Sequence, residues 1–304
     1  MNVAVLAAPE DMRDVVPMLG VFKNLRVPAF GLKIHPSWGT VARLGLAGRL
    51  EQATHVLVLS SGRHAGLPWF VFSVGFALGK NLRLVLYRTD AAWDPPAYLA
   101  RQPILDSLAE LENFFLLERG EWAILEEKRA ARSALLEIGI SFHADSFVQC
   151  VSEGQIHAVE LFLKAGLHAN ARDRHGVPIL NLAARNRHRA VAELLLEFGA
   201  AIDLQSEDRG YSALMDAVLV GSVELADLFL RHGANPDLKS KDGQTALVVA
   251  VGRGDEAIVE LLLAGKADPD IPDKLGLSAR QYARLFNNPG LAALFEAGGR
   301  TDGA

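Results

Sequence analysis

The chain has almost no cysteine and no long apolar run, and each shortage excludes a class of protein. Among its 304 residues Cys150 is the only cysteine. It cannot belong to an intramolecular disulfide framework, and we expect it to be a small buried side chain. The most apolar stretch, residues 67–79, is shorter than the roughly 20 residues that a membrane-spanning helix needs. We therefore expect a buried helix there and no membrane partner.

An excess of basic charge is also missing. The formal net charge is −5, so sequence-independent binding to nucleic acid has little electrostatic basis. Residues 1–11 carry no basic leader and reach Glu10 and Asp11 at once, unlike a secretory signal, so we expect a cytoplasmic protein. The sequence has no HExxH pattern, no GxGxxG after its first apolar run and no GxSxG. We expect no metal ion and no cofactor.

Internal repeats dominate the second half of the sequence. Gly176, Gly210, Gly243 and Gly276 recur every 33 or 34 residues, and each follows a short polar cluster. After each glycine comes a small or β-branched residue and an apolar pair that can begin a helix. A second predicted helix ends in a leucine run and a glycine, as in residues 193–199 and 227–233. This period predicts stacked helix pairs.

The pattern resembles ankyrin repeats, whose period is about 33 residues. The resemblance covers about residues 140–299, with an N-terminal repeat at residues 146–166 and a polar terminal repeat at 273–299. We therefore predict an all-α solenoid of about five repeats over residues 140–304. Its implied work is to bind a protein partner.

In a repeat stack the finger-like loops and the first helices are free to vary, and they form the usual binding face. An individual residue of this set can equally be ordinary solvated surface. Asp173, Asp242 and Asp273 are expected instead to stabilise the turns, because an Asp side chain bonds backbone amides two residues on. The partner-binding residues predicted from the register are Arg174, Leu182, Arg185, Asn186, Arg209, Asp216, Leu219, Lys241, Val249 and Arg253.

Residues 1–139 have a different pattern, in which short apolar runs alternate with helical stretches. Apolar strands without alternation are covered on both faces, and βαβα order indicates a parallel sheet. We expect a five-stranded, doubly wound α/β domain in flavodoxin-like order. The candidate strands are residues 3–8, 28–33, 55–59, 82–87 and 114–117. The candidate helices are residues 10–25, 39–52, 69–80, part of 96–108, and 121–138.

The order of elements in the first 125 residues resembles a Toll/interleukin-receptor (TIR) domain. The resemblance rests on residues 7–11 after the first strand, residues 35–38, and a third strand that leads into Trp69 and an apolar helix. Nucleoside deoxyribosyltransferases share this layout. Trp69, Phe72 and Phe76 can alternatively be core residues without further meaning.

The resemblance implies where catalysis would occur. In enzymatically active members of the TIR family a glutamate four residues after the tryptophan carries NAD cleavage, and that place is Ser73 here. A serine hydroxyl has no charge with which to stabilise the cation that forms as nicotinamide leaves. Residues 33–37 also depart from the family's acidic Pro-Gly loop. We therefore expect no catalytic residue and no NAD glycohydrolase activity.

These expectations favour a non-enzymatic adaptor in which a TIR-like domain precedes an ankyrin stack. The ankyrin stack is expected to bind a protein, and the TIR-like domain is a candidate for self-association. The alternative is a sensor or an NAD glycohydrolase in which the front domain binds a nucleotide and the repeats select the target.

Overall fold

The computed structural model describes residues 1–34, 40–61, 63–64 and 66–297. The chain divides into two compact units, Met1–Glu126 and Glu127–Ala304, which we call the front unit and the repeat unit. The division falls inside one long helix. The domain boundary between residues 139 and 140 stays a prediction.

The front unit contains the predicted five-stranded parallel sheet. Its strands, in spatial order, are β2 (Ala29–Lys33), β1 (Val3–Ala7), β3 (His55–Ser60), β4 (Arg83–Arg88) and β5 (Ile104–Leu105). Every neighbouring pair is parallel, and Val3 lies opposite both Ala29 of β2 and His55 of β3.

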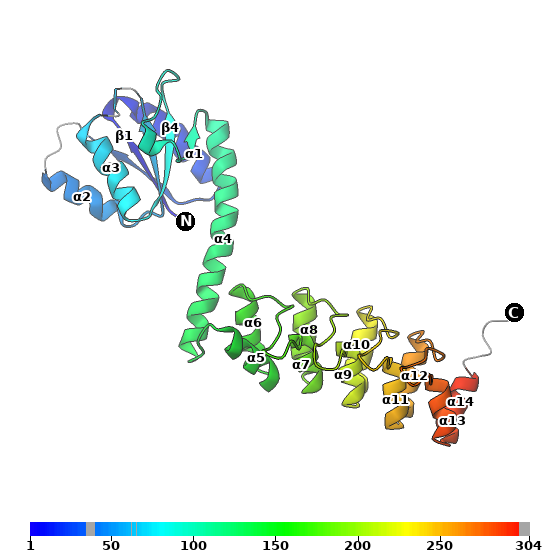
Figure 1. Cartoon of the computed structure of the whole chain (residues 1–304). Coiled ribbons are helices and arrows are strands. Elements are labelled where there is room, and N and C mark those ends of the chain that lie inside the picture. The colour runs from blue at the N-terminus through cyan, green and yellow to red at the C-terminus, as the bar shows by residue number, and fades with distance from the viewer. Residues whose placement is uncertain (35–39, 62, 65, 298–304) are drawn as a thin grey trace. The chain divides into compact units, whose positions relative to one another are not determined.

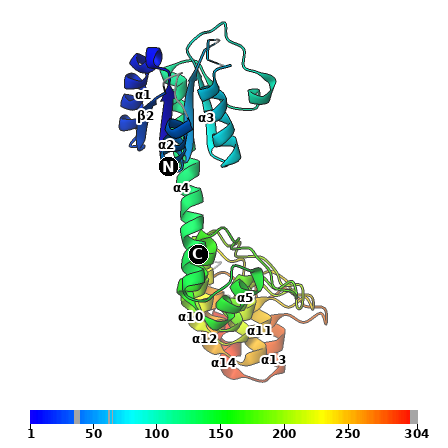
Figure 2. The same cartoon turned by 90° about the vertical axis from the view of Figure 1, so that its left-hand side faces the viewer.

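Helices cover both faces of this sheet, as Figure 2 shows for α1 and α3. Side chains of successive strand residues point to opposite faces, so Val3 and Val5 pack under α1 (Met12–Asn24) and α4 (Leu108–Glu137). Ala4 and Leu6 pack on the other face under α2 (Thr40–Leu50) and α3 (Pro68–Gly79). A 3₁₀ turn, η1 (Pro9–Asp11), joins β1 to α1. Within the described residues, no helix is long and apolar enough to cross a membrane.

The structure corrects the end of the front unit. Residues 114–117, predicted as a strand, lie in α4, and the fifth strand is the two-residue β5. The cause is helical spacing, because Leu111 and Phe115 lie one turn apart and are both buried against the sheet. Ser107 Oγ also accepts a hydrogen bond from Glu110 N, which caps the helix. The helix predicted within residues 96–108 is only a 3₁₀ turn, η2 (Ala97–Leu99).

Within its described residues, 127–297, the repeat unit contains five helix pairs, which are stacked side by side (Figure 1). Ser212, Thr245 and Ser278 each cap a first helix by accepting a hydrogen bond from a backbone amide three residues on. The pairs are α5 (Ala144–Glu153) with α6 (Ile156–Lys164), α7 (Ile179–Arg185) with α8 (Arg189–Glu197), α9 (Ala213–Leu219) with α10 (Val223–Arg231), α11 (Ala246–Arg253) with α12 (Glu256–Ala264), and α13 (Ala279–Leu285) with α14 (Pro289–Ala297).

The C-terminal part of α4 completes the core of the repeat unit. Ala131 and Leu135 are buried in the same apolar cluster as the first helix pairs. The Arg132 guanidinium lies 4.4 Å from the centroid of the Phe142 ring. This part of α4 therefore covers the end of the N-terminal repeat.

We predict that a fragment of residues 127–304 unfolds cooperatively and is more stable than a fragment of residues 140–304. Removal of Ala131 and Leu135 from the core should cost about 3 kcal/mol of unfolding free energy. Urea denaturation followed by circular dichroism measures the difference. Equal midpoints for the two fragments would mean that α4 contributes nothing to the stack.

Candidate functional site

The binding face predicted for the repeats begins with the loops that precede the first helices, and we call residues 173–176, 207–210, 240–243 and 273–276 the fingers. The loops extend to one side of the stack (Figure 2). Backbone hydrogen bonds join each finger to the next: Glu207 N donates to Gly176 O (3.1 Å), Lys241 N to Arg209 O (2.9 Å), and Lys274 N to Asp242 O (3.1 Å). This ladder makes the fingers a continuous scaffold.

Side chains at one register position stabilise the turn in three of the four fingers that the structure describes. Asp173 Oδ1 accepts hydrogen bonds from His175 N (2.8 Å) and Val177 N (2.9 Å), and Asp273 Oδ1 bonds Leu275 N and Leu277 N in the same way. These two predictions are confirmed. The prediction for Asp242 is wrong, because Ser240 Oγ accepts from the amides of Asp242 and Gln244 there. Ser240, not Asp242, is the residue in register with Asp173.

Most of the predicted binding residues lie at the surface, but two do not. Asp216 is 0% and Val249 is 7% exposed, so the exposure that the register predicts for them is wrong. Asp216 contacts Asn181 and Arg185 of the preceding repeat, and Val249 belongs to the apolar core of the stack. The structure leaves Leu182, Arg185 and Leu219 half-buried, and it leaves Arg174, Asn186, Arg209, Lys241 and Arg253 exposed.

Asp216 and Arg185 belong to a buried polar cluster between two repeats. Asn181 Nδ2 donates to Asp216 Oδ2 (2.8 Å) and to Tyr211 O (2.9 Å). Arg185 Nε lies 3.0 Å from Asp216 Oδ1, in a contact that is an ion pair and not an aligned hydrogen bond. The two terminal nitrogens of Arg185 bind Asp208 (2.7 and 3.0 Å). Arg185 is therefore held by two carboxylates, and sequence spacing gives no sign of this pairing.

The pKa values of the two carboxyl groups around Arg185 are shifted in opposite directions. Burial raises the pKa of Asp216, against the opposing effects of Asn181 and Arg185. The hydrogen bonds from Arg185 lower the pKa of Asp208. Burying a charge is unfavourable unless it is paired, so Asp216 depends on Arg185 for its place in the stack.

The front unit has a second candidate site beyond the carboxyl ends of its strands. A cavity of about 350 Å³ is lined by residues that follow β1, β3 and β4, including Glu10, Asp11, Ser61, His64 and Thr89. It lies at the edge of the sheet where the chain leaves β1 toward one face and β3 toward the other. Open α/β sheets bind ligands at this position.

His64 is the centre of this cavity and is only 2% exposed. Its Nδ1 lies 3.2 Å from Ser61 Oγ and 3.4 Å from Asp11 Oδ2, and its Nε2 lies 3.3 Å from Glu10 Oε1. Burial raises the pKa of Asp11, whereas a backbone hydrogen bond and His64 lower that of Glu10. His64 is not among the residues predicted from the sequence. Ser61 is its neighbour along the chain, whereas Glu10 and Asp11 are brought to it by the parallel pairing of β1 and β3.

Ser73 does not line this cavity. It is 0% exposed, and its Oγ donates a hydrogen bond to Trp69 O in the same helix (2.7 Å). Trp69 is buried in the core beside Phe70, with Phe72 and Phe76 packed against the same cluster. The predicted loop of residues 35–38 lies outside the described residues.

Comparison with known proteins agrees with the repeat architecture. Residues 147–240 and 214–300 match the family model described as ankyrin repeats (3 copies). An ankyrin repeat-containing protein of Treponema pallidum (strain Nichols) is 39% identical over 245 residues, which are 81% of this chain and 82% of that protein. This match is longer than the repeats alone and extends into the front unit.

Other proteins match the chain over shorter segments, which are a small part of their own length. The human 2-5A-dependent ribonuclease is 34% identical over 85 residues, 28% of this chain and 11% of that protein. The ankyrin repeat and KH domain-containing protein mask-1 of Caenorhabditis elegans is 34% identical over 98 residues, 32% of this chain and 4% of that protein. From its repeats, its helix pairs and these matches, the chain belongs to the ankyrin-repeat protein family.

Proposed function

We propose that the chain is a non-enzymatic adaptor that binds a protein partner on the face formed by its fingers and first helices. Ankyrin repeats support a role in protein–protein interaction. The observation that carries the proposal is a set of exposed basic side chains, with Arg209 and Lys241 on fingers and Arg253 at the end of a first helix. The backbone of these fingers is joined from one finger to the next. A rigid scaffold with exposed charged side chains loses little conformational entropy on binding.

The scaffold also restrains these side chains. Arg253 Nη1 donates to Leu219 O of the preceding repeat (2.5 Å), and Lys241 Nζ donates to Glu207 O. Arg253 and Lys241 are therefore held at the junctions between repeats and remain exposed to solvent. Such side chains are suited to an acidic segment of a partner.

We predict that the triple variant Arg209→Ala, Lys241→Ala, Arg253→Ala binds the partner at least about 10-fold more weakly, because each exposed charge pair contributes up to about 1 kcal/mol. Its free energy of unfolding should fall by no more than about 2 kcal/mol in all. A pull-down with the full chain, followed by calorimetry with the captured protein, measures the loss.

The matched control removes three cations from the second helices and the turns beside them: Arg189→Ala, Arg231→Ala and Lys266→Ala. These residues are exposed but lie away from the fingers. The control should retain wild-type affinity. Equal losses in both triple variants would indicate nonspecific attraction, and no loss in either would move the binding site elsewhere.

We further propose that the front unit is a TIR-like domain that has lost catalysis and can self-associate. The strand order β2-β1-β3-β4-β5, which doubly wound flavodoxin-like sheets share, supports this proposal. The burial of Ser73, in the place of the family's catalytic glutamate, supports the loss of activity. Sedimentation velocity over a range of concentrations tests the self-association.

A second candidate function is a nucleotide or NAD sensor, and the cavity around His64 favours it. Carboxylates such as Glu10 and Asp11 are suited to accept hydrogen bonds from ribose hydroxyls. Incubation of the purified chain with NAD tests this function through turnover and through a shift in melting temperature. Binding without turnover would favour the sensor, turnover the enzyme, and neither the adaptor.

A further inference from the structure

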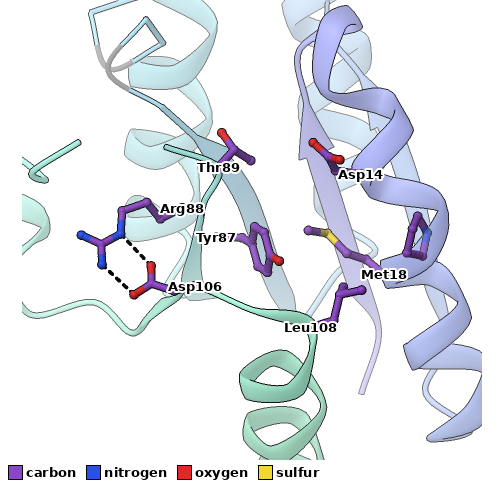
Figure 3. A pocket seen from close by; sticks show the side chains of 8 residues that line it. Asp14, Met18, Tyr87, Arg88, Thr89, Asp106 and Leu108 are labelled. Carbon is purple, nitrogen blue, oxygen red and sulfur yellow. Dashed lines mark hydrogen bonds and ion pairs between the residues drawn. The ribbon is translucent and has the colours of Figure 1, made fainter. Parts of the chain in front are cut away.

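The front unit contains a smaller pocket of about 260 Å³ on the α1 and α4 side of its sheet (Figure 3). Asp14, Pro17 and Met18 reach it from α1, Tyr87 from β4, and Leu108 from the first turn of α4. In Figure 3 the Met18 thioether points toward the Tyr87 ring, and Asp14 lies one turn before Met18 on α1. The pocket is below the roughly 300–1,000 Å³ typical of drug-sized ligands, so it suits a small group.

Arg88, the basic residue next to Tyr87, also lines the pocket, together with Thr89 and Asp106. Neighbouring strand residues point to opposite sides, and in Figure 3 Arg88 turns away from Tyr87 toward Asp106. Arg88 Nε and Nη2 donate to the two oxygens of Asp106, each at 2.6 Å. The Arg88 charge is therefore already paired with Asp106, which lines the same pocket.

The Asp14 carboxylate therefore lacks a close cation among the described residues. The nearest is Arg13, whose Nε is 4.0 Å from Asp14 Oδ1 and whose side chain is 87% exposed, so solvent screens the pair strongly. Burial, together with the charges of Asp14, Glu110 and Asp106, raises the pKa of Tyr87. The surroundings of Tyr87 are thus negative, and an anionic ligand is disfavoured.

The part of the wall formed by α1 and the start of α4 also offers apolar and polarisable surface. Met18 is fully buried and forms the floor, and Pro17 and Leu108 contribute carbon surface. An aromatic ring attracts a cation placed over its face, and a thioether adapts to alkyl chains. A carboxylate, a phenol ring and an apolar floor together are complementary to a cation on a short hydrocarbon chain.

We propose that this pocket binds a primary ammonium group on an unbranched alkyl chain, with Asp14 accepting its hydrogen bond and Tyr87 and Met18 packing along the chain. The ammonium group belongs either to a free aliphatic amine or to a lysine side chain of another protein. The proposal does not depend on the function of the repeats.

Calorimetric titration of the full chain with n-butylammonium tests the pocket. A ligand of this size is expected to bind with a Kd on the order of 1 mM. Asp14→Asn keeps the shape and removes the charge, and should weaken binding about 10-fold because a charge-assisted hydrogen bond is lost. Tyr87→Leu, which removes the ring, should weaken binding by a smaller factor of about 3.

The matched control is Glu112→Gln, which removes an exposed carboxylate of α4 that does not line the pocket. It should bind n-butylammonium as the wild type does, and n-butanol, the neutral analogue, should not bind. Urea unfolding of each variant verifies that it is folded. Absence of n-butylammonium binding, or an equal affinity of Asp14→Asn and Glu112→Gln, would overturn the proposal.

Two further probes distinguish the source of the ammonium group once n-butylammonium binds. The peptide Gly-Gly-Lys-Gly-Gly with blocked ends presents a lysine side chain, and its Nζ-acetylated form removes the charge. Tighter binding of the lysine peptide than of n-butylammonium, lost on acetylation, would assign the pocket to a protein partner. Binding of the free amine alone would assign it to a small-molecule ligand.

Discussion

Arg185→Ala is expected to destabilise the repeat unit by about 3 kcal/mol, because it leaves the Asp216 carboxylate buried without its cation. Asp216 is fully buried and its Oδ1 lies 3.0 Å from Arg185 Nε. Asn181 would then be its remaining partner. Urea denaturation of residues 127–304 measures the change, and Arg174→Ala, which removes an exposed arginine, should cost no more than about 0.5 kcal/mol.

Replacement of both members of the pair should restore most of the stability. The neighbouring repeats carry Leu182 and Val249 in register with Asp216, and Leu219 in register with Arg185. The double variant Arg185→Leu, Asp216→Val is therefore expected to lie within about 1 kcal/mol of the wild type, since apolar residues often replace a buried ion pair without loss. A double variant no more stable than Arg185→Ala would show that the ion pair itself is required.

Ser73→Glu is expected to destabilise the front unit by at least about 3 kcal/mol and to produce no NAD cleavage. The position is fully buried on the face of α3 that carries Trp69, Phe70, Val74 and Ala77. An unpaired carboxylate there must stay protonated or disrupt the core. Thermal unfolding and an NAD turnover assay on the full chain measure the two effects.

Ser73→Ala is the matched control for this position. Ser73 Oγ bonds only the carbonyl of Trp69 within its own helix, and such a bond contributes little to stability. The alanine variant should stay within about 1 kcal/mol of the wild type. A glutamate variant that is stable and cleaves NAD would show that this side chain reaches the cavity after all. NAD turnover by the wild type would contradict the adaptor proposal.

The helix pairs of the repeat unit were predictable because their interactions are local. The glycine spacing, the apolar pairs and the capping residues all lie within one period of the sequence, and the structure has a helix pair at each predicted place. The Asp173 and Asp273 turns follow from the same local chemistry. The prediction for Asp242 is wrong because the position whose side chain accepts from the turn amides lies two residues earlier, at Ser240.

The sheet of the front unit was predictable from the sequence, but the prediction for its last strand is wrong. Continuous apolar runs mark the four longer strands, since both faces of a covered sheet need apolar side chains. Residues 114–117 are equally apolar. However, the buried residue of this run, Phe115, lies one helical turn after the buried Leu111. A short apolar run does not by itself distinguish a strand from a buried helix.

The sequence by itself determined the repeat period, the helix pairs and the parallel sheet. Only the tertiary structure decided that Asp216 is buried against Arg185, that His64 lies between Glu10 and Asp11, and that Asp14 and Tyr87 line one pocket. The physical reason is range. Helices, caps and turns depend on residues a few positions apart, whereas pairing and burial of charges depend on segments that meet only when repeats stack and strands align.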